Sequence, residues 1–429
     1  NFISLTNVPS LFISPPDFIY DDIILRTYLD TELVKMYSLS RYFIFQRIPL
    51  YIFFITYIID LIIDRRWTVR NIGKERYLFL AFILYFLLIP IYRIDEDSNR
   101  FFAKSIETFL PFLVFGLIGF LGFNSKFRIQ YFAYTLIFIS VGSIILITRY
   151  IGVSTFINSP EKTDLFSVNR IELFNSHMNY NIYLNLSILA IFYLFITRPF
   201  KFKVAVIPLL SVCLIIISYV LLISEGRTGF ITTLITGSIF FIYFLVKWKK
   251  RMIVPFVIIL IPAITYVVKN NKRLSKNFME KEPRIVIWEA GVNTTKQSFP
   301  WGMGVSDGRE QFFKNGLLCI KESSPEDFNN RGLSVVKDDF TQGKMHTHNQ
   351  FIWSTVSFGI IGIILLLFIL IYPCFIGNKG KKVFISLAVA IFTIQMVFEN
   401  FGVGISVILF CFMLTLFFHS NRKLVGENH

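Results

Sequence analysis

Charged residues are scarce in this chain of 429 residues, because only 17% of them are Asp, Glu, Lys or Arg. A soluble domain carries roughly 25%, whereas here 54% of the residues are hydrophobic and the mean hydropathy is +0.60. Several apolar runs reach 17 residues or more, long enough as helices to cross a hydrocarbon core of about 30 Å. The runs are continuously apolar, which argues against barrel strands, whose residues alternate. We therefore expect an all-α polytopic membrane protein.

Cysteine and histidine are also rare, with four and five residues respectively. Three cysteines lie in apolar runs and only Cys319 lies in a long polar segment, so we expect no intramolecular disulfide framework. Acidic residues (28) are fewer than basic ones (43), which gives a net charge of +15. Many basic residues fall in short connections between apolar runs and no nucleic-acid-reading motif accompanies them. We interpret the charge as a topology signal and expect no nucleic-acid partner.

Apolar runs suited to membrane spans are spread along most of the chain. They cover residues 49–64, 77–92, 108–123, 130–151, 180–197, 204–223, 230–246, 252–268, 351–376, 383–398 and 401–418. The chain then divides into an N-terminal segment without an assigned span (1–48), helices with short loops (49–268), one large loop (269–350), and C-terminal helices with a short tail (351–429). These eleven runs, with one more helix before or within 1–48, predict 11–12 spans.

The connections between the runs alternate in charge. Every odd connection is basic, for example residues 65–76 and 247–251, whereas the even ones are mixed or acidic, such as 95–97. Basic connections lie in the cytoplasm. We therefore expect residues 152–179, 224–229, 269–350 and 399–404 on one side of the membrane, away from the cytoplasm.

The first of these outward connections contains Arg170 and ends in a polar group around His177. Ser176 and Asn179, which flank that histidine, also fit simple helix caps. The last outward connection, 399–404, contributes the carboxylate of Glu399.

Arg227 lies in a very short connection, Ser224 to Gly229. An arginine this close to hydrocarbon is costly unless it is paired or lines a wet cavity, and snorkelling to the surface is the alternative. A turn needs only the glycines, so we favour a functional role for Arg227.

The large loop begins with a helical pattern. Ile285, Trp288 and Val292 are spaced as the apolar face of an amphipathic helix that starts at Pro283. The helix dipole does not favour Arg284 in the first turn. Arg284 is therefore a candidate anion ligand, because a helix N-terminus with an arginine makes a phosphate site; an ordinary solvated arginine is the alternative.

The later part of the loop carries a glycine turn and a polar segment. We interpret Pro300 to Gly304 as a turn whose backbone amides are free to approach a ligand. Residues 305–345 are polar and mixed in charge, and we expect variable surface structure or a lid there, with Arg309 and Arg331 solvated.

Two of the five histidines lie where the large loop meets the next apolar run. His346 and His348 have a spacing found in metal sites, but no further Cys, Asp or Glu follows at ligand-like spacing, so we expect no metal. Helix capping explains Asn349 but not His348. A histidine accepts protons near neutral pH and suits general-base work on a hydroxyl. No Ser-His-Asp or Gly-x-Ser-x-Gly pattern indicates an acyl hydrolase.

The order of these motifs resembles the O-antigen ligase and O-antigen polymerase superfamily. The resemblance is carried by the Arg-Thr-Gly of Arg227, the Arg-x-x-x-Trp of Arg284, the Pro-x-Gly-x-Gly of Pro300, and the His-Asn of His348. The glycines Gly359 and Gly362 after His-Asn, and the His-Met-Asn of His177, also resemble the family. The resemblance covers about residues 165–405, and the eleven runs depart from the usual twelve spans.

This resemblance implies a membrane glycosyltransferase of GT-C-like architecture in the bacterial inner membrane, with a large periplasmic loop and its active site facing the periplasm. The donor would be an undecaprenyl-diphosphate-linked glycan and the acceptor a glycan or lipid A–core, without cofactor or essential metal. Membrane lipids are expected partners, and the resemblance admits a chain-length regulator protein.

The resemblance also implies roles for individual residues. Arg227 and Arg284 would bind the donor diphosphate, and His348 would activate the acceptor hydroxyl. The further substrate-binding candidates are His346, Asn349, His177, Arg170 and Glu399.

Two choices follow from this interpretation. Nothing in the loops looks dedicated to a densely phosphorylated core, which favours a polymerase over a ligase. A transporter or flippase for lipid-linked oligosaccharide is the alternative from another class, but it would be expected to show broken helices and ionisable groups near the midplane. A non-catalytic assembly partner would leave the arginines and His348 unexplained.

Overall fold

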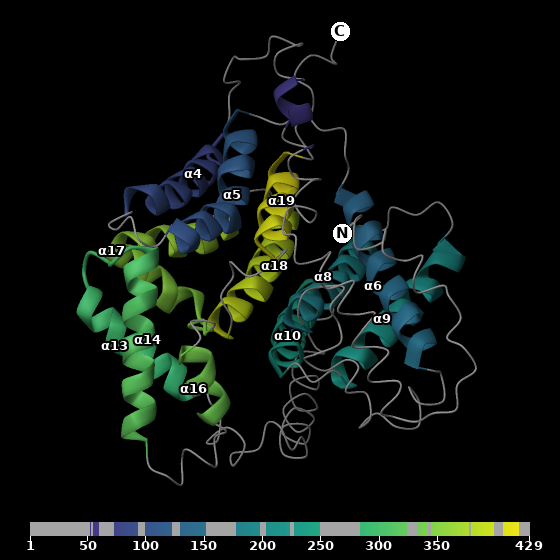
Figure 1. The fold of residues 1–429 in the computed structure, drawn as a ribbon. Helices are drawn as coiled ribbons and strands as arrows, with labels where there is room; N and C mark the ends of the chain where they lie inside the picture. The colour runs from purple at the N-terminus through teal and green to yellow at the C-terminus, as the bar shows by residue number, and fades with distance from the viewer. Residues whose placement is uncertain are drawn as a thin grey trace.

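The computed structural model describes residues 52, 55–59, 73–92, 99–121, 129–151, 177–197, 203–223, 227–248, 284–323, 333–341, 345–376, 379–398 and 406–419. Within these ranges the regular elements are all helices and none is a strand (Figure 1). The helices are α4 (Arg76–Ile91), α5 (Asn99–Leu121), α6 (Ile129–Ile151), α8 (His177–Thr197), α9 (Lys203–Ile223), α10 (Arg227–Trp248), α13 (Arg284–Ser298), α14 (Val305–Glu322), α16 (Leu333–Thr341), α17 (Gln350–Ile371), the short 3₁₀ helix η7 (Tyr372–Cys374), α18 (Lys379–Phe398) and α19 (Ser406–His419).

Nine of the predicted spans coincide with described helices, namely α4, α5, α6, α8, α9, α10, α17, α18 and α19. Two stretches among the described residues are long and apolar enough to cross a membrane, Tyr180–Thr197 and Gln350–Cys374, and the other seven helices hold shorter apolar stretches. These helices confirm the predicted all-α membrane class. The predicted runs 252–268 and most of 49–64, like residues 1–48, lie outside the described residues.

Contacts between the helices agree with the alternation expected from the charged connections. The hydroxyl of Tyr372, at the end of α17, donates to the carbonyl of Lys74 just before α4 at 2.8 Å. Both residues were expected on the cytoplasmic side. At the opposite ends, the Phe109 ring of α5 stacks on Trp353 of α17 with 5.1 Å between centroids. Helices α4, α5 and α17 therefore pack in the up-and-down order that the sequence predicts.

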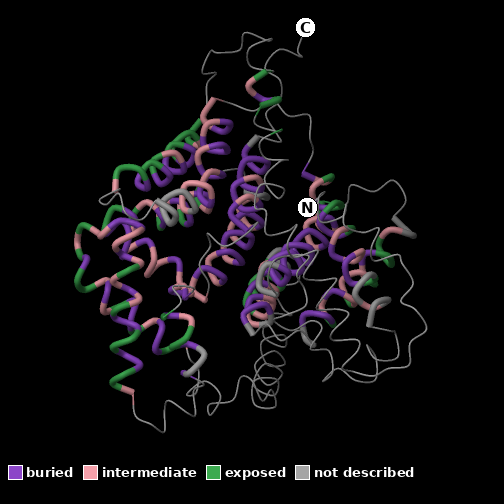
Figure 2. The backbone as a smooth tube through the Cα atoms, viewed as in Figure 1, coloured by how far each residue is buried: buried purple, intermediate pink, exposed green. Residues whose placement is uncertain are grey.

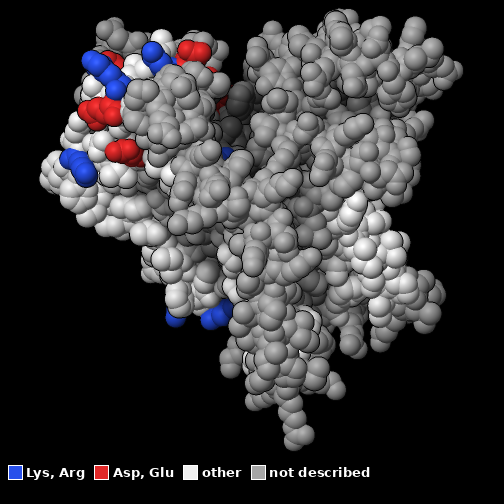
Figure 3. All heavy atoms as spheres, turned by 90° about the horizontal axis from the view of Figure 1, so that it is seen from below, with Lys and Arg blue, Asp and Glu red and all other residues white. Residues whose placement is uncertain are grey.

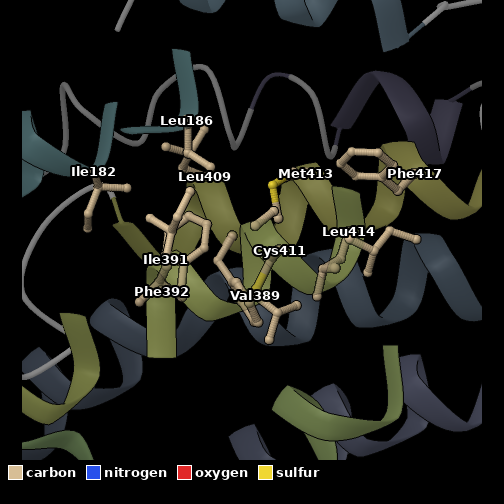
Figure 4. Close-up of a cluster of buried hydrophobic side chains, with 14 of the residues drawn as sticks. Ile182, Leu186, Val389, Ile391, Phe392, Leu409, Cys411, Met413, Leu414 and Phe417 are labelled. Atoms are coloured by element: carbon tan, nitrogen blue, oxygen red, sulfur yellow. The ribbon is translucent and has the colours of Figure 1, made fainter. Parts of the chain in front are cut away.

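The core between these helices is apolar and rich in phenylalanine. Residues of α8, α18 and α19 are buried over most of their length (Figure 2). Figure 4 shows Leu186 of α8 and Ile391 of α18 gathered with Leu409 and Met413 of α19. Since α18 and α19 also separate the helices on the two sides of Figure 1, they form the centre of the bundle.

The large loop contains a small folded unit of its own. Helices α13, α14 and α16 lie together beside α17 (Figure 1) and enclose a second apolar cluster, in which the rings of Phe312 and Phe340 lie 5.2 Å apart. Cys319 is buried in this cluster, and burial raises the pKa of its thiol. The sequence did not predict that α14 and α16 share a buried core with α13, and a role of this segment as a lid stays a prediction.

The charged side chains of this unit lie mainly on the outside of α14 and α16. Figure 3 shows acidic and basic groups gathered over one lobe of the molecule. The lobe includes an exposed ion pair between Lys314 and Glu310 at 2.7 Å. Arg309 differs from its prediction as a solvated residue, because it is half-buried with its guanidinium carbon 5.4 Å from the centre of the Phe313 ring. Arg331 lies outside the described residues.

The helix predicted at the start of the large loop is present as α13, but its predicted apolar face is wrong. Ile285 and Val292 are 42% and 45% exposed, whereas Val286, Ile287 and Ala290 are buried. The buried side also includes small residues, which let α13 pack against both α14 and α17.

Candidate active site

The residues from Met345 to Gln350 join the loop unit to the membrane helices. Met345 is buried in the loop cluster, and its backbone N–H donates to the carbonyl of Asp339 at 3.2 Å. Gln350, the first residue of α17, is buried at the other end. His346 and His348 lie between these two anchors and are half-buried. The predicted histidines therefore lie in a segment that is anchored at both ends, between the apolar cluster of the loop unit and the core of the membrane helices.

The backbone of His348 adopts a conformation that few residues take. Its φ of +46° lies in the left-handed region, which is uncommon for residues other than glycine, although Asn, Asp and His enter it more often than most. Such outliers cost free energy and persist where the surroundings determine them. This conformation turns the chain from the loop into α17 and sets the direction of the His348 side chain.

Asn349 is the N-cap of α17 and also holds the end of α18. Its Oδ1 accepts hydrogen bonds from the N–H groups of Phe351 at 2.9 Å and Ile352 at 3.0 Å. Its Nδ2 donates to the carbonyl of Val397 at 3.0 Å. One side chain thus satisfies backbone groups at the start of one helix and at the end of another. Helix capping is confirmed for Asn349, and its contact with substrate stays a prediction.

Helix α13, which begins with Arg284, contacts the segment that contains His348. Arg284 is half-buried. Trp288 follows four residues later on the same face of the helix, and its indole N–H donates to the carbonyl of His348 at 3.4 Å. The Trp288 ring also lies 6.0 Å from that of Phe398 at the end of α18. The start of α13, the start of α17 and the end of α18 therefore meet at one place, which we call the junction.

A buried hydrogen-bonded group lies directly beneath the junction. The Tyr85 hydroxyl of α4 is 2.6 Å from the Ser354 hydroxyl, and Gln350 Nε2 donates to the Tyr85 oxygen at 3.2 Å. All three side chains are almost completely buried. Sequence reasoning missed this group: Gln350 and Ser354 stand out as polar residues four apart in an apolar run, but nothing in the sequence indicates Tyr85 as their partner.

His177 and Arg227 are the first residues of α8 and α10. Their helices pack closely at this end, because a Cβ at Gly229 would lie 2.5 Å from Asn181 Cγ and Asn185 Nδ2 donates to the Gly229 carbonyl at 3.2 Å. The interpretation of Ser224 to Gly229 as one turn is therefore wrong from Arg227 onward, since these residues are helical. The side chains of His177 and Arg227 lie outside the described parts of the chain.

Helix α18 connects this pair of helix starts with the junction. The ring of Phe384, early in α18, lies 5.0 Å from Tyr193, late in α8, and 6.1 Å from Phe240 in α10. Ile182, early in α8, shares the buried cluster with Ile391, later in α18 (Figure 4). Helices α8 and α18 therefore run in opposite directions. The starts of α8 and α10 accordingly lie toward the same end of the bundle as the end of α18.

The sequence predicted that the turn from Pro300 to Gly304 offers free amides to a ligand. That prediction is wrong, because the amides of Gly302, Met303 and Gly304 are hydrogen-bonded within the protein. Helix α17 is broken at Gly359, where φ is +61° and ψ is −147°. The carbonyls of Val356 and Ser357 accept hydrogen bonds from the N–H groups of Met303 at 2.9 Å and Gly304 at 2.8 Å. In return, the N–H of Ile360 donates to the Pro300 carbonyl at 2.8 Å. The turn thus replaces hydrogen bonds that the break removes from α17.

Both glycines at this contact are required by the close approach of the two backbones. A Cβ on Gly302, whose φ is +85°, would lie 2.5 Å from the nitrogen of Gly359. A Cβ on Gly359 would overlap the carbonyl oxygen of Pro300. The Pro-x-Gly-x-Gly motif therefore fixes the loop unit to α17.

Two predicted site residues, Arg170 and Glu399, lie outside the described residues. Among the remaining candidates, the structure brings the helix that begins with Arg284 to His348 and Asn349 at the junction and places the backbones of His177 and Arg227 at the same end of the bundle.

Fold and junction together define an all-α membrane protein with a polar meeting point of helix ends. Residues 212–367 match the family model described as O-antigen ligase. This match confirms the resemblance to the O-antigen ligase and polymerase superfamily and indicates an enzyme of the glycosyltransferase type. Arg227, Arg284, His346, His348 and Asn349 lie within the matched residues, whereas Arg170, His177 and Glu399 lie outside them. No curated protein matches the chain significantly.

Proposed function

We propose that this protein transfers a glycan from undecaprenyl diphosphate to an acceptor hydroxyl on the periplasmic side of the bacterial inner membrane. The observation that carries the proposal is the junction, where the left-handed His348 is joined through Trp288 to the helix that begins with Arg284. This arrangement falls within the residues that match the O-antigen ligase family.

The two arginines suit the donor end of the reaction. When the bond between the sugar and the diphosphate breaks, negative charge develops on the diphosphate oxygens. A guanidinium group binds such oxygens through two parallel N–H donors and keeps its charge at any physiological pH. Donors held in place before the reaction stabilise this charge without further rearrangement. We assign this role to Arg284 at the start of α13 and to Arg227 at the start of α10.

His348 suits the acceptor end. In the proposed step, an imidazole nitrogen of His348 accepts the proton of the acceptor hydroxyl as that oxygen bonds to the anomeric carbon. The bond between the anomeric carbon and the diphosphate oxygen breaks, and undecaprenyl diphosphate leaves with the electron pair. The step needs no metal and no cofactor, because arginines neutralise the leaving group and histidine takes the proton.

The remaining polar candidates fit positions around the substrates. We propose that His346, Asn349, His177, Arg170 and Glu399 contact the glycan or the acceptor. For Asn349 this contact would be in addition to its hydrogen bonds to the ends of α17 and α18.

Among the described helices, the break in α17 favours a transporter, because transporters use broken helices at their binding sites. Two features argue against that interpretation. Residues 356–362 contain no ionisable side chain, and the carbonyls of Val356 and Ser357 at the break are bonded to the loop turn rather than facing a cavity. We therefore retain the glycosyltransferase.

The acceptor is either another lipid-linked repeat unit or lipid A–core, and we favour the repeat unit and hence a polymerase. The lipopolysaccharide of a strain lacking this protein distinguishes the two. Core that carries a single repeat unit is the result we expect. Unligated polymer retained on the undecaprenyl carrier would instead identify a ligase, and an unchanged ladder would contradict both.

A further inference from the structure

The turn between α13 and α14 exposes two aromatic side chains. Phe299 is 56% exposed and Trp301 is 70% exposed. The backbone around them is nevertheless firmly held, because Pro300, Met303 and Gly304 are hydrogen-bonded to α17. Large aromatic side chains that point outward from a fixed turn indicate a contact surface.

These aromatic residues lie beside an exposed apolar stripe of α17. Beyond the break, Ile360, Ile364, Leu367 and Ile371 are exposed at spacings of one helical face. In an all-α membrane protein, such a stripe on a span faces acyl chains. The carbonyl of Pro300 accepts a hydrogen bond from Ile360, the first residue of the stripe. The exposed aromatic residues of the turn therefore continue the lipid-facing surface of α17.

The length of α17 sets the level of the turn relative to the bilayer. Gln350–Cys374 is long enough to cross a membrane. Residues 360–374 alone would rise only about 22 Å at 1.5 Å per residue, less than the hydrocarbon thickness of about 30 Å. The crossing therefore needs residues before the break, so Gly359 lies inside the bilayer thickness. The turn that is bonded to Gly359 and its neighbours lies at that level too.

Irregular backbone is tolerated at this depth only where its polar groups are satisfied within the protein. The turn meets this condition: the N–H of Gly302 donates to the Ser298 carbonyl at 2.7 Å, and those of Met303 and Gly304 donate to α17. The turn can therefore expose its aromatic rings to lipid while its amides stay bonded to protein.

The positions of the charged residues in the α13–α14 hairpin agree with a turn that lies in lipid. Lys296 is exposed in the last turn of α13, three residues before Phe299, and a lysine there can extend its ammonium to the lipid headgroups. Along α14, Glu310 and Lys314 form an exposed ion pair, and Lys321 and Glu322 are exposed at its C-terminal end. The hairpin is thus apolar at its turn and charged farther from the turn.

We propose that the α13–α14 turn is a membrane anchor, in which Phe299 and Trp301 insert among the acyl chains of the bilayer beside α17. The large loop is then not entirely aqueous, because its first helical hairpin enters the membrane at the turn. The anchor also fixes the far end of the helix that begins with Arg284. It depends on the membrane class of the protein and not on the proposed reaction.

Tryptophan fluorescence in proteoliposomes tests the anchor. The full chain and its Trp301→Phe variant are reconstituted in phosphatidylcholine with or without brominated acyl chains, and iodide is added separately as an aqueous quencher. The difference between the two proteins isolates the emission of Trp301. We expect brominated lipid to quench this emission more strongly than iodide does.

A matched control places a tryptophan on α14, toward the charged end of the same hairpin. Leu318 on α14 is 54% exposed, and Leu318→Trp in the Trp301→Phe background should be quenched by iodide more than by brominated lipid. The proposal is overturned if iodide quenches Trp301 at least as strongly as brominated lipid, or if neither quencher affects it. Because no glycan transfer is measured, either outcome leaves the proposed function untouched.

Discussion

At the residue scale, the proposed reaction depends on how firmly His348 is held. Its left-handed backbone is fixed on one side by Trp288, which bonds to its carbonyl, and on the other by Asn349, which caps α17 and binds the end of α18. The direction in which the His348 side chain leaves the backbone is therefore fixed. This is the kind of preorganisation that a general base needs.

Replacing His348 with asparagine tests its role without disturbing its backbone. Asparagine enters the left-handed region more readily than most residues, so folding should be preserved, whereas the proton acceptor is lost. We expect transfer to fall by roughly 10²–10⁴-fold, the usual contribution of a general base, with unchanged expression. His348→Ala should lose activity as well. Full transfer by a well-folded asparagine variant would remove His348 from the mechanism.

Replacing Arg227 with lysine separates charge from geometry. Lysine keeps the positive charge but cannot offer the paired donors of a guanidinium. We expect transfer by Arg227→Lys, measured at saturating acceptor, to be severely impaired, with Arg284→Lys behaving in the same way. Lys314, exposed on the loop unit, provides a control: Lys314→Arg should be neutral. A normal rate in both arginine variants would indicate structural roles.

At the element scale, the contact between the α13–α14 turn and the broken helix α17 ties the loop unit to the membrane helices. Sequence reasoning found the turn but assigned its amides to a ligand, since hydrogen bonds to a helix distant in sequence leave no local signal. It also misplaced the buried face of α13. Hydrophobic spacing selected Ile285 and Val292, but close packing on two sides selected small residues such as Ala290.

Substituting Gly359 tests this contact. In Gly359→Ala, the new methyl group would overlap the Pro300 carbonyl oxygen, and alanine is disfavoured at a positive φ. We expect a loss of stability of about 1–3 kcal/mol, typical of overpacking, measured by thermal unfolding in detergent. The control is Gly237→Ala in α10, where a Cβ would meet no atom within 4 Å. Equal unfolding temperatures for the two variants would contradict a stabilising role for the contact between the α13–α14 turn and α17.

At the scale of the whole molecule, the hydrophobic and charge patterns predicted most of the architecture. The bilayer imposes the same length and hydrophobicity on every span and the same charge preference on every connection. Local sequence therefore suffices to locate the spans. For the meeting of α13, α17 and α18, the sequence predicted only that the residues concerned lie on the same side of the membrane. The contacts that join them, such as Trp288 to His348 and Asn349 to Val397, depend on tertiary packing that single-sequence patterns do not encode.

The most direct test of the account is transfer by the purified protein in proteoliposomes that contain an undecaprenyl-diphosphate-linked glycan and excess EDTA. We expect glycan to move onto the acceptor and undecaprenyl diphosphate to be released in equal amount, with neither product formed by the His348→Asn variant. Absence of transfer when donor and acceptor are both present, or activity that EDTA abolishes and a divalent metal restores, would contradict the proposed mechanism.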